Sequence, residues 1–246
     1  METNQVALVT GASRGIGLEW CRQLAELGYA VILTARTREK AEAAFKKLSS
    51  SQNNIDCQVL ELTDESACAA LAKYISEKYH KLDVLINNAG ANPGDSGKPD
   101  ESEKNSWLEF LDPSELLKYM HINAIAPVIL AKHVRKALAS SGHGKIINIT
   151  SRLGSIQLKR SGGQYSYCGS KALLNMLNRC MAFELVNDRI SSIVVHPGWV
   201  KTDMGGAGAP LSTTQSVKGM IENVLNKITL HDAGKFYQYD GAEIPW

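Results

Sequence analysis

Residues 6–17 read Val-Ala-Leu-Val-Thr-Gly-Ala-Ser-Arg-Gly-Ile-Gly, an apolar β-branched run that leads into a turn with three glycines. A short run of this kind predicts a buried strand, and the helical spacing of Ile16, Leu24 and Leu27 predicts a helix over residues 16–27. Strand, glycine turn and helix therefore follow one another directly. This order is typical of the first unit of a nucleotide-binding α/β fold.

The three glycines have separate conformational tasks in such a turn. Gly11 lets the chain turn sharply after the strand, Gly15 lets phosphates approach the backbone, and Gly17 permits close contact between helix and sheet. The N-terminus of the helix then faces a pyrophosphate. The spacing Gly-x-x-x-Gly-x-Gly differs from the Gly-x-Gly-x-x-Gly fingerprint, and no Gly-Lys-Ser/Thr follows to make a triphosphate loop. A purely structural turn is the alternative.

Strands and helices alternate along the rest of the chain. Strands are predicted at residues 6–10, 31–35, 56–62, 84–87, 145–150 and 191–196, and helices at 16–27, 38–49, 64–79, 113–140 and around Tyr167. This alternation predicts the α/β class: a doubly wound parallel sheet, or Rossmann fold, in a single domain over residues 1–246. Residues 91–103 predict a polar surface loop, with a rim of the substrate cleft as the alternative.

Composition and charge indicate which kinds of partner, such as nucleic acid, membrane or metal, are expected. A content of 44% hydrophobic and 21% charged residues is ordinary for a globular protein. The net charge of +2 over 246 residues argues against a nucleic-acid partner. Because neither a charged-then-apolar leader nor an apolar run of about 18 residues occurs, we expect a cytoplasmic protein with no membrane partner. The five cysteines lack Cys-x-x-Cys spacing and the six histidines are scattered, so no disulfide framework and no metal site are predicted.

Tyr167 and Lys171 form a Tyr-x-x-x-Lys pair. Residues four apart share one face of a helix, so we expect the Lys171 ammonium beside the Tyr167 phenol, where it lowers the pKa of the phenol. A free phenol has a pKa of about 10, and a lower pKa makes it usable as an acid or base near neutrality. Alone, the pair could be a solvated lysine over a packed ring, but the upstream glycine turn favours catalysis.

Four motifs together resemble the short-chain dehydrogenase/reductase family in order and spacing. They are Thr10-Gly-x-x-x-Gly-x-Gly17, Asn87-Asn88-Ala89-Gly90, Tyr167-x-x-x-Lys171 and Pro197-Gly198. The match spans nearly the whole chain. Within the family, residues 196–206 and 239–246 resemble the branch of sniffer carbonyl reductases and C-factors. The resemblance implies hydride transfer between a nicotinamide cofactor and a carbonyl carbon.

The resemblance implies NADP(H) as the cofactor. Dinucleotide folds that prefer NAD usually have an acidic residue after the second strand, whereas this chain has Arg36 there and Arg14 inside the glycine turn. Both guanidinium groups could bind the 2′-phosphate, or both could be solvated. The resemblance implies further contacts from Gly11, Ser13, Gly15, Ile16, Gly17, Asn87, Ala89, Gly90, Tyr167, Lys171, Pro197, Gly198, Val200 and Thr202. The turn at residues 87–90 could equally be structural.

The catalytic group that the resemblance implies is Ser151, Tyr167, Lys171 and Asn123. Ser151 follows a predicted strand and would hydrogen-bond the substrate oxygen, but its gap to Tyr167 is longer than is common, so Ser155 is a rival. Tyr167 would donate a proton during reduction, and Lys171 would hold the nicotinamide ribose. Asn123 would hold a water in a proton relay, or alternatively bond to local backbone.

We therefore expect an NADPH-dependent enzyme that reduces a small-molecule aldehyde, ketone or quinone. One alternative is a C-factor-like signalling or binding protein that retains the nucleotide site, and another is an NAD-dependent alcohol or hydroxysteroid dehydrogenase. Family resemblance also implies a homodimer or homotetramer. Loops near residues 157–164 and 199–212 would form the substrate pocket.

Overall fold

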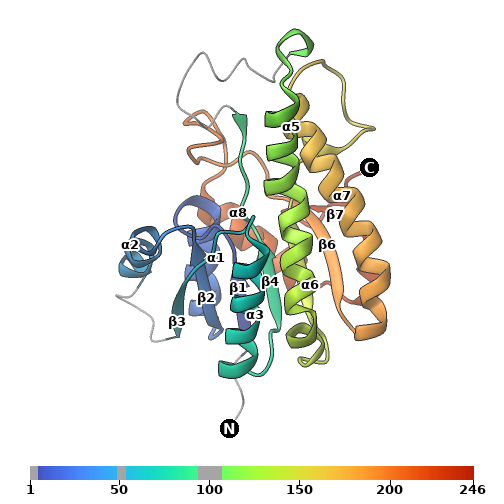
Figure 1. Cartoon of the computed structure of the whole chain (residues 1–246). Helices are drawn as coiled ribbons and strands as arrows, with labels where there is room; N and C mark the ends of the chain where they lie inside the picture. Colours follow the sequence, from blue (N-terminus) through green and yellow to red (C-terminus); the bar gives the residue numbers. More distant parts are fainter. Residues whose placement is uncertain (1–4, 49–53, 94–106) are drawn as a thin grey trace.

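Seven parallel strands form one sheet in the part of the chain that the computed structural model describes, residues 5–48, 54–93 and 107–246 (Figure 1). The strands are β1 Val6–Val9, β2 Ala30–Ala35, β3 Ile55–Val59, β4 Val84–Asn87, β5 Lys145–Ile149, β6 Ser191–His196 and β7 Phe236–Gln238. Their order is β3-β2-β1-β4-β5-β6-β7, the doubly wound arrangement that the alternation predicts. The strand order reverses between β1 and β4, where ligands of such folds bind.

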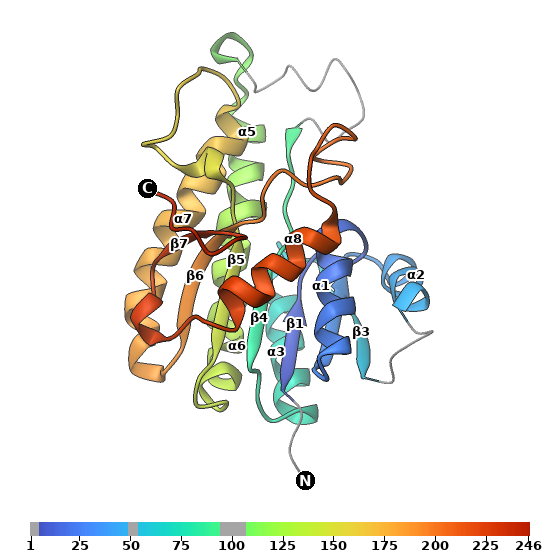
Figure 2. The same ribbon diagram turned by 180° about the vertical axis from the view of Figure 1, so that it is seen from behind.

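Helices cover both faces of the sheet. One face carries α3 (Glu65–Lys78), α6 (Ala126–Ala139) and α7 (Tyr165–Leu185), and α5 (Pro113–Met120) continues the line of α6 beyond the sheet (Figure 1). The opposite face carries α1 (Gly15–Glu26), α2 (Arg38–Leu48) and α8 (Thr213–Met220) (Figure 2). None of the described helices has both the length and the apolar character needed to cross a bilayer.

The side chains of β1 show how the two cores arise. Ala7 and Val9 pack with α1 and α8, whereas Val6 and Leu8 pack with α3 and α6. Because successive residues of a strand point to opposite faces, a strand covered on both sides is apolar at every position. This requirement explains why residues 6–17 begin with an uninterrupted apolar run.

Two features differ from the sequence prediction. The helix expected over residues 113–140 contains a π-helical turn at His121–Ile125, which separates α5 from α6. The sequence analysis did not predict α8 and β7, although a capping box at Ser212 marks the start of α8. The other elements occur with shifted ends; β3, for example, ends at Val59 rather than at residue 62. Most of the polar loop expected at residues 91–103 lies outside the described residues.

Candidate active site

The glycine turn after β1 closely approaches the turn after β4. Gly11 and Gly15 have φ angles of 63° and 56°, in the region that favours glycine. A Cβ on Gly11 would lie 2.7 Å from the Ala89 Cα. A Cβ on Gly17 would lie 2.5 Å from Asn88 Nδ2 and equally close to the Gly11 carbonyl oxygen. Gly17 therefore makes room for the neighbouring turn, rather than for the sheet as expected.

Thr10 links these two turns. Its buried Oγ1 accepts hydrogen bonds from the N–H groups of Asn88 and Ala89, at 3.0 and 3.1 Å. Asn88 Nδ2 donates in return to the carbonyl oxygens of Thr10 and Gly11, at 3.0 and 3.2 Å. Neither Thr10 nor Asn88 was assigned a role from the sequence alone. The polar residue at the end of an apolar strand is the signal that could have pointed to this link.

The side chain of Asn87 points into the protein. Its Nδ2 donates to Asn148 Oδ1 at 2.8 Å and to the Pro127 carbonyl oxygen at 3.3 Å, and the residue is buried. This side chain therefore supports the fold, and a contact of residue 87 with the cofactor stays a prediction. Ala89 is half-buried and Gly90 is exposed, so a ligand can reach the later part of the same turn.

The N-terminus of α1 is suited to an anion. Arg14 occupies the N-cap position without a side-chain cap, and the first turn contains no acidic residue within the described helix. The first backbone N–H groups of a helix lack helical partners and lie at the positive end of its dipole. Ser13 and Ile16 are half-buried in the same turn. Together with the open backbone at Gly15, this cradle fits the pyrophosphate of a dinucleotide.

Arg14 forms an ion pair with Asp203, which lies in the loop after β6. Both side chains are mostly exposed, 68% for Arg14 and 71% for Asp203. Arg36 is also exposed, in the turn after β2. The sequence analysis did not anticipate Asp203 as a partner, because no local pattern connects two residues so far apart in the chain.

The loop after β6 folds back towards the glycine turn. Pro197 is buried, and Gly198 has a φ of 86°. Val200 is also buried and forms a parallel bridge with Leu211. Thr202 Oγ1 accepts a 3.0 Å hydrogen bond from a backbone N–H in the same loop. A Cβ on Gly15 would lie 3.4 Å from Thr202 Cγ2, so the loop and the glycine turn are in contact.

Hydrogen-bond partners distinguish Ser151 from Ser155. Ser151 Oγ accepts a 3.1 Å bond from the Leu153 N–H, and its O–H has no acceptor among the described residues. Ser155 Oγ donates to the Pro245 carbonyl oxygen at 2.6 Å and accepts from the Leu158 N–H at 3.2 Å. The Ser155 hydroxyl is therefore already used within the protein, whereas Ser151 retains a donor for another oxygen.

Tyr167 and Lys171 lie one turn apart at the start of α7. The Lys171 ammonium is 5.9 Å from the centre of the Tyr167 ring, and it donates a 2.9 Å hydrogen bond to the Ile149 carbonyl oxygen. Lys171 is 4% exposed, and this burial lowers the pKa of its ammonium to about 8. The lysine thus stays largely charged at neutral pH, anchored to the end of the strand that leads to Ser151.

Asn123 lies in the π-helical turn and bonds to distant parts of the chain. Its Nδ2 donates to the Ala91 carbonyl oxygen at 2.8 Å and to Ser170 Oγ at 2.9 Å, and its Oδ1 accepts from the Ala91 N–H at 2.8 Å. Ser170, which the sequence analysis missed, donates in turn to the Tyr167 carbonyl oxygen at 2.8 Å. The alternative of a bond to local backbone is therefore not what the geometry shows.

Two glycines bring the surrounding segments against Lys171. A Cβ on Gly90 would lie 3.5 Å from Lys171 Nζ and 3.3 Å from Asn123 Oδ1. A Cβ on Gly154 would lie 2.8 Å from the Lys171 backbone carbon. Neighbouring segments at the carboxyl end of β5 thus carry a serine hydroxyl, a phenol and an ammonium. These three groups can bind a polar oxygen and give it a proton.

A cavity of about 400 Å³ adjoins the segments that carry Ser151 and Tyr167. Its lining comprises Trp107, Leu153, Lys159, Ser161, Gly162, Gly163 and Gln164. Leu153 follows Ser151 by two residues, and Gln164 is the N-cap of α7, three residues before Tyr167. One predicted pocket loop, 157–164, therefore lines this cavity. The other, 199–212, contributes none of the lining residues.

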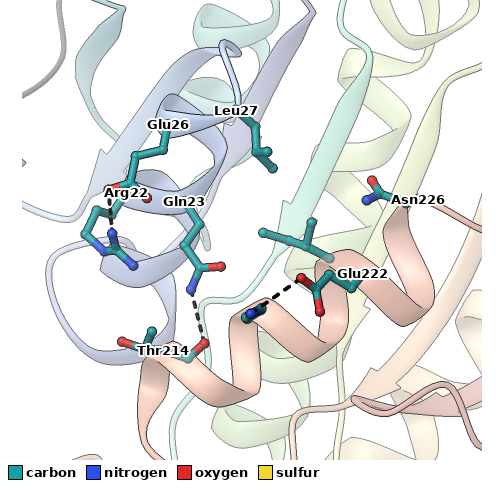
Figure 3. Close-up of a pocket in the computed structure, with 9 residues that line it drawn as sticks. Arg22, Gln23, Glu26, Leu27, Thr214, Glu222 and Asn226 are labelled. Carbon is teal, nitrogen blue, oxygen red and sulfur yellow. Dashed lines mark hydrogen bonds and ion pairs between the residues drawn. The ribbon is translucent and has the colours of Figure 1, made fainter.

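A second cavity, of about 380 Å³, lies between α1 and α8 and contains none of the predicted site residues (Figure 3). Its charged side chains are paired with one another: Arg22 bonds to Glu26, and Lys218 lies 3.7 Å from Glu222. None of its lining residues belongs to the glycine turn or to α7.

Comparisons with known proteins extend over most of the chain. The family model described as short chain dehydrogenase matches residues 5–210. The C-signal of Myxococcus xanthus is 36% identical over 167 residues, which cover 67% of this chain and 93% of that protein. A short-chain dehydrogenase of Penicillium roqueforti is 31% identical over 231 residues, which cover 89% of this chain and 88% of that protein.

Solved structures match the described fold at similar identity. An NADPH-bound carbonyl reductase from chicken fatty liver has a TM-score of 0.87 and 33% identity, with 99% of each chain covered. The carbonyl reductase Sniffer of D. melanogaster has a TM-score of 0.87 and 31% identity, with 100% of each chain covered.

Proposed function

Because this chain belongs to the short-chain dehydrogenase family, we propose that it is an NADPH-dependent reductase of small aldehydes, ketones or quinones. The observation that carries the proposal is the Lys171 ammonium, which lies 5.9 Å from the centre of the Tyr167 ring and is bonded to the end of β5, two residues before Ser151. A protein that only bound nucleotide would not need all three side chains.

Each of these side chains has a proposed task. The Ser151 hydroxyl and the Tyr167 phenol would donate hydrogen bonds to the substrate carbonyl oxygen as negative charge develops there. Tyr167 would then transfer its proton to that oxygen, and the Lys171 charge would favour this transfer by stabilising the phenolate. When bound, NADPH would supply the hydride that the carbonyl carbon accepts.

Asn123 is proposed as part of the same group, in a positioning role. Its bonds to Ala91 support the turn that presses Gly90 against Lys171, and its bond to Ser170 supports the first turns of α7. Its two amide donors and one acceptor position have protein partners, which leaves one Oδ1 lone pair for the water that the resemblance implies.

NADPH rather than NADH is supported by Arg36 and Arg14, whose guanidinium groups suit a 2′-phosphate. The pyrophosphate would lie on the backbone of Gly11, Ser13, Gly15, Ile16 and Gly17. The adenine ribose would lie near the turn that contains Asn87, Ala89 and Gly90, and the nicotinamide end near Pro197, Gly198, Val200 and Thr202. The bound NADPH of the chicken carbonyl reductase supports the same choice. An NAD-dependent alcohol or hydroxysteroid dehydrogenase remains the competing enzyme.

A signalling role is a second candidate function, favoured by the 36% identity to the C-signal of Myxococcus xanthus. Such a role would need the nucleotide site without turnover. The two functions therefore differ in whether the Tyr167 hydroxyl matters.

A panel of aldehydes, ketones and quinones with NADPH and with NADH tests the proposal, with oxidation of the cofactor as the readout. We expect turnover with NADPH, and a loss of about 10² to 10⁴ in kcat for Tyr167→Phe with cofactor binding retained. More than a tenth of the wild-type kcat in Tyr167→Phe would refute the role of the phenol. Absence of turnover across the panel would favour the signalling role.

The other expectations from the sequence remain predictions: a single domain over residues 1–246, a cytoplasmic location, and a homodimer or homotetramer. Light scattering on the purified protein measures the oligomeric state directly.

A further inference from the structure

The cavity of about 400 Å³, which adjoins the segments that carry Ser151 and Tyr167, has an apolar side. Trp107 and Leu153 line it, and they are 57% and 40% exposed, so both side chains can cover a ligand. Gly162 and Gly163 add backbone without side-chain bulk. A flat, apolar or aromatic body is the shape that such a lining accommodates.

Among the described residues of the lining, Lys159 carries the charge. Its ammonium donates to the Gly163 carbonyl oxygen at 3.1 Å and lies 3.4 Å from Cys168 Sγ. An ammonium has three donors, so these two contacts hold Lys159 in place and leave one donor for a ligand. Within the described part of the chain, no carboxylate pairs with Lys159, whereas Arg22 and Lys218 of the cavity in Figure 3 both have acidic partners.

The stretch that supplies the lining residues other than Trp107 is one-sided in charge. Residues 151–183 contain five basic side chains and no aspartate or glutamate. The basic residues are Arg152, Lys159, Arg160, Lys171 and Arg179. This stretch therefore places no carboxylate of its own near Lys159 that would repel an anion.

We infer that the site takes carbonyl compounds that carry an anionic group, such as a carboxylate, on an apolar or aromatic body, with Lys159 as the residue that binds the anion. This inference rests on the proposed function. The chemical step is unchanged: the carbonyl carbon gains a hydride from NADPH, the oxygen gains a proton from Tyr167, and the products are an alcohol and NADP⁺. The carboxylate is bound but does not react.

Matched substrate pairs test the inference. They are 4-carboxybenzaldehyde and 4-(4-formylphenoxy)butanoate, which differ in reach, each compared with its neutral primary amide at saturating NADPH. For at least one pair, we expect kcat/KM of wild type to favour the acid about five- to tenfold, a value at the low end for a charge-assisted bond because Lys159 is half-buried. The preference should shrink as salt is added.

Variants assign the effect to one side chain. Lys159→Met should lower kcat/KM for the acid several-fold more than for the amide and so bring the acid-to-amide ratio close to one, and Lys159→Arg should retain the preference. Arg160→Gln is the matched control, because the Arg160 guanidinium is bonded back to the Gln157 and Lys159 carbonyl oxygens. It should change the ratio less than twofold.

Three results would overturn the inference. The first is a wild-type ratio of one or less for both pairs, with the amides still reduced, which would leave the proposed function intact. The second is an equal loss for acid and amide in Lys159→Met, which would mean that Lys159 only supports the loop. The third is no reduction of any of the four aldehydes, which would refute aldehyde reduction and the inference with it.

Discussion

The guanidinium of Arg14 is paired with the carboxylate of Asp203, so the glycine turn and the loop after β6 hold each other across the proposed cofactor site. An exposed pair of this kind contributes about 0–1 kcal/mol. A ligand phosphate offers Arg14 a charge-assisted bond of about 1.5–3 kcal/mol. The phosphate is therefore able to replace Asp203 as the partner of Arg14.

Asp203→Asn should strengthen NADPH binding about two- to fivefold, because it removes a competitor for Arg14 and a negative charge near the 2′-phosphate. NADH binding should change little, since NADH lacks that phosphate. Fluorescence titration of both cofactors measures the effect. Asp188→Asn is the control, because Asp188 pairs with Arg135 outside the site. Equal changes for the two cofactors would contradict the competition.

Arg36→Ala should weaken NADPH binding about ten- to hundredfold and leave NADH binding almost unchanged, the result expected from losing one charge-assisted bond to a phosphate. Arg36→Asp should go further and shift preference towards NADH, because the carboxylate repels the phosphate and can accept a bond from a ribose hydroxyl. Calorimetric titrations decide between this role and a purely structural one. A structural role would weaken both cofactors alike.

Ser151→Ala should lower kcat sharply without a large change in stability, because its hydroxyl makes one bond within the protein. Ser155→Ala should change kcat less and lower the stability of the fold more. It leaves the Pro245 carbonyl oxygen and the Leu158 N–H without their partner, which costs about 1–3 kcal/mol and lowers Tm by several degrees. Steady-state kinetics and thermal unfolding of both variants compare them. If Ser155→Ala has the larger loss in kcat, the longer loop has moved the catalytic role to Ser155.

The buried Lys171 should make the free energy of unfolding change with pH in the alkaline range. Burial lowers its pKa from 10.5 to about 8, so between these values the unfolded chain binds a proton that the folded protein has released. Stability therefore rises with pH across this window, relative to Lys171→Met, by up to about 3 kcal/mol. Urea unfolding of cofactor-free wild type and Lys171→Met at several pH values from 7.5 to 10.5 gives the difference. A constant difference would show that the pKa of Lys171 is not lowered in the folded protein.

Local patterns were sufficient to predict the fold class and most of its elements, although α8 and β7 were missed. The apolar run of β1 and the spacing of Ile16, Leu24 and Leu27 depend on neighbours within a few residues, and so does the Tyr167–Lys171 step on α7. Burial on both faces makes each parallel strand apolar throughout, which is easy to see in a sequence. The alternation of strands with helices then predicted a doubly wound parallel sheet, but not the order of its strands.

Contacts between distant segments could not be predicted in this way. The π-helical turn at His121–Ile125 is held by Asn123 bonds that span 32 and 47 residues, and such a turn leaves the apolar spacing of the flanking helices intact. The Arg14–Asp203 pair spans 189 residues. Neither has a spacing rule, because the fold alone brings the partners together.

The bond from Ser155 to Pro245 joins residues 90 positions apart, and the Gln157 N–H likewise donates to the Trp246 carbonyl oxygen at 2.8 Å. On the ribosome, the strand before Ser151 and the helix after it emerge well ahead of residues 245 and 246. The nascent chain can therefore assemble most of its sheet while the segment after Ser151 still lacks this anchor. That segment acquires its final shape only after residues 245 and 246 have emerged and docked against it.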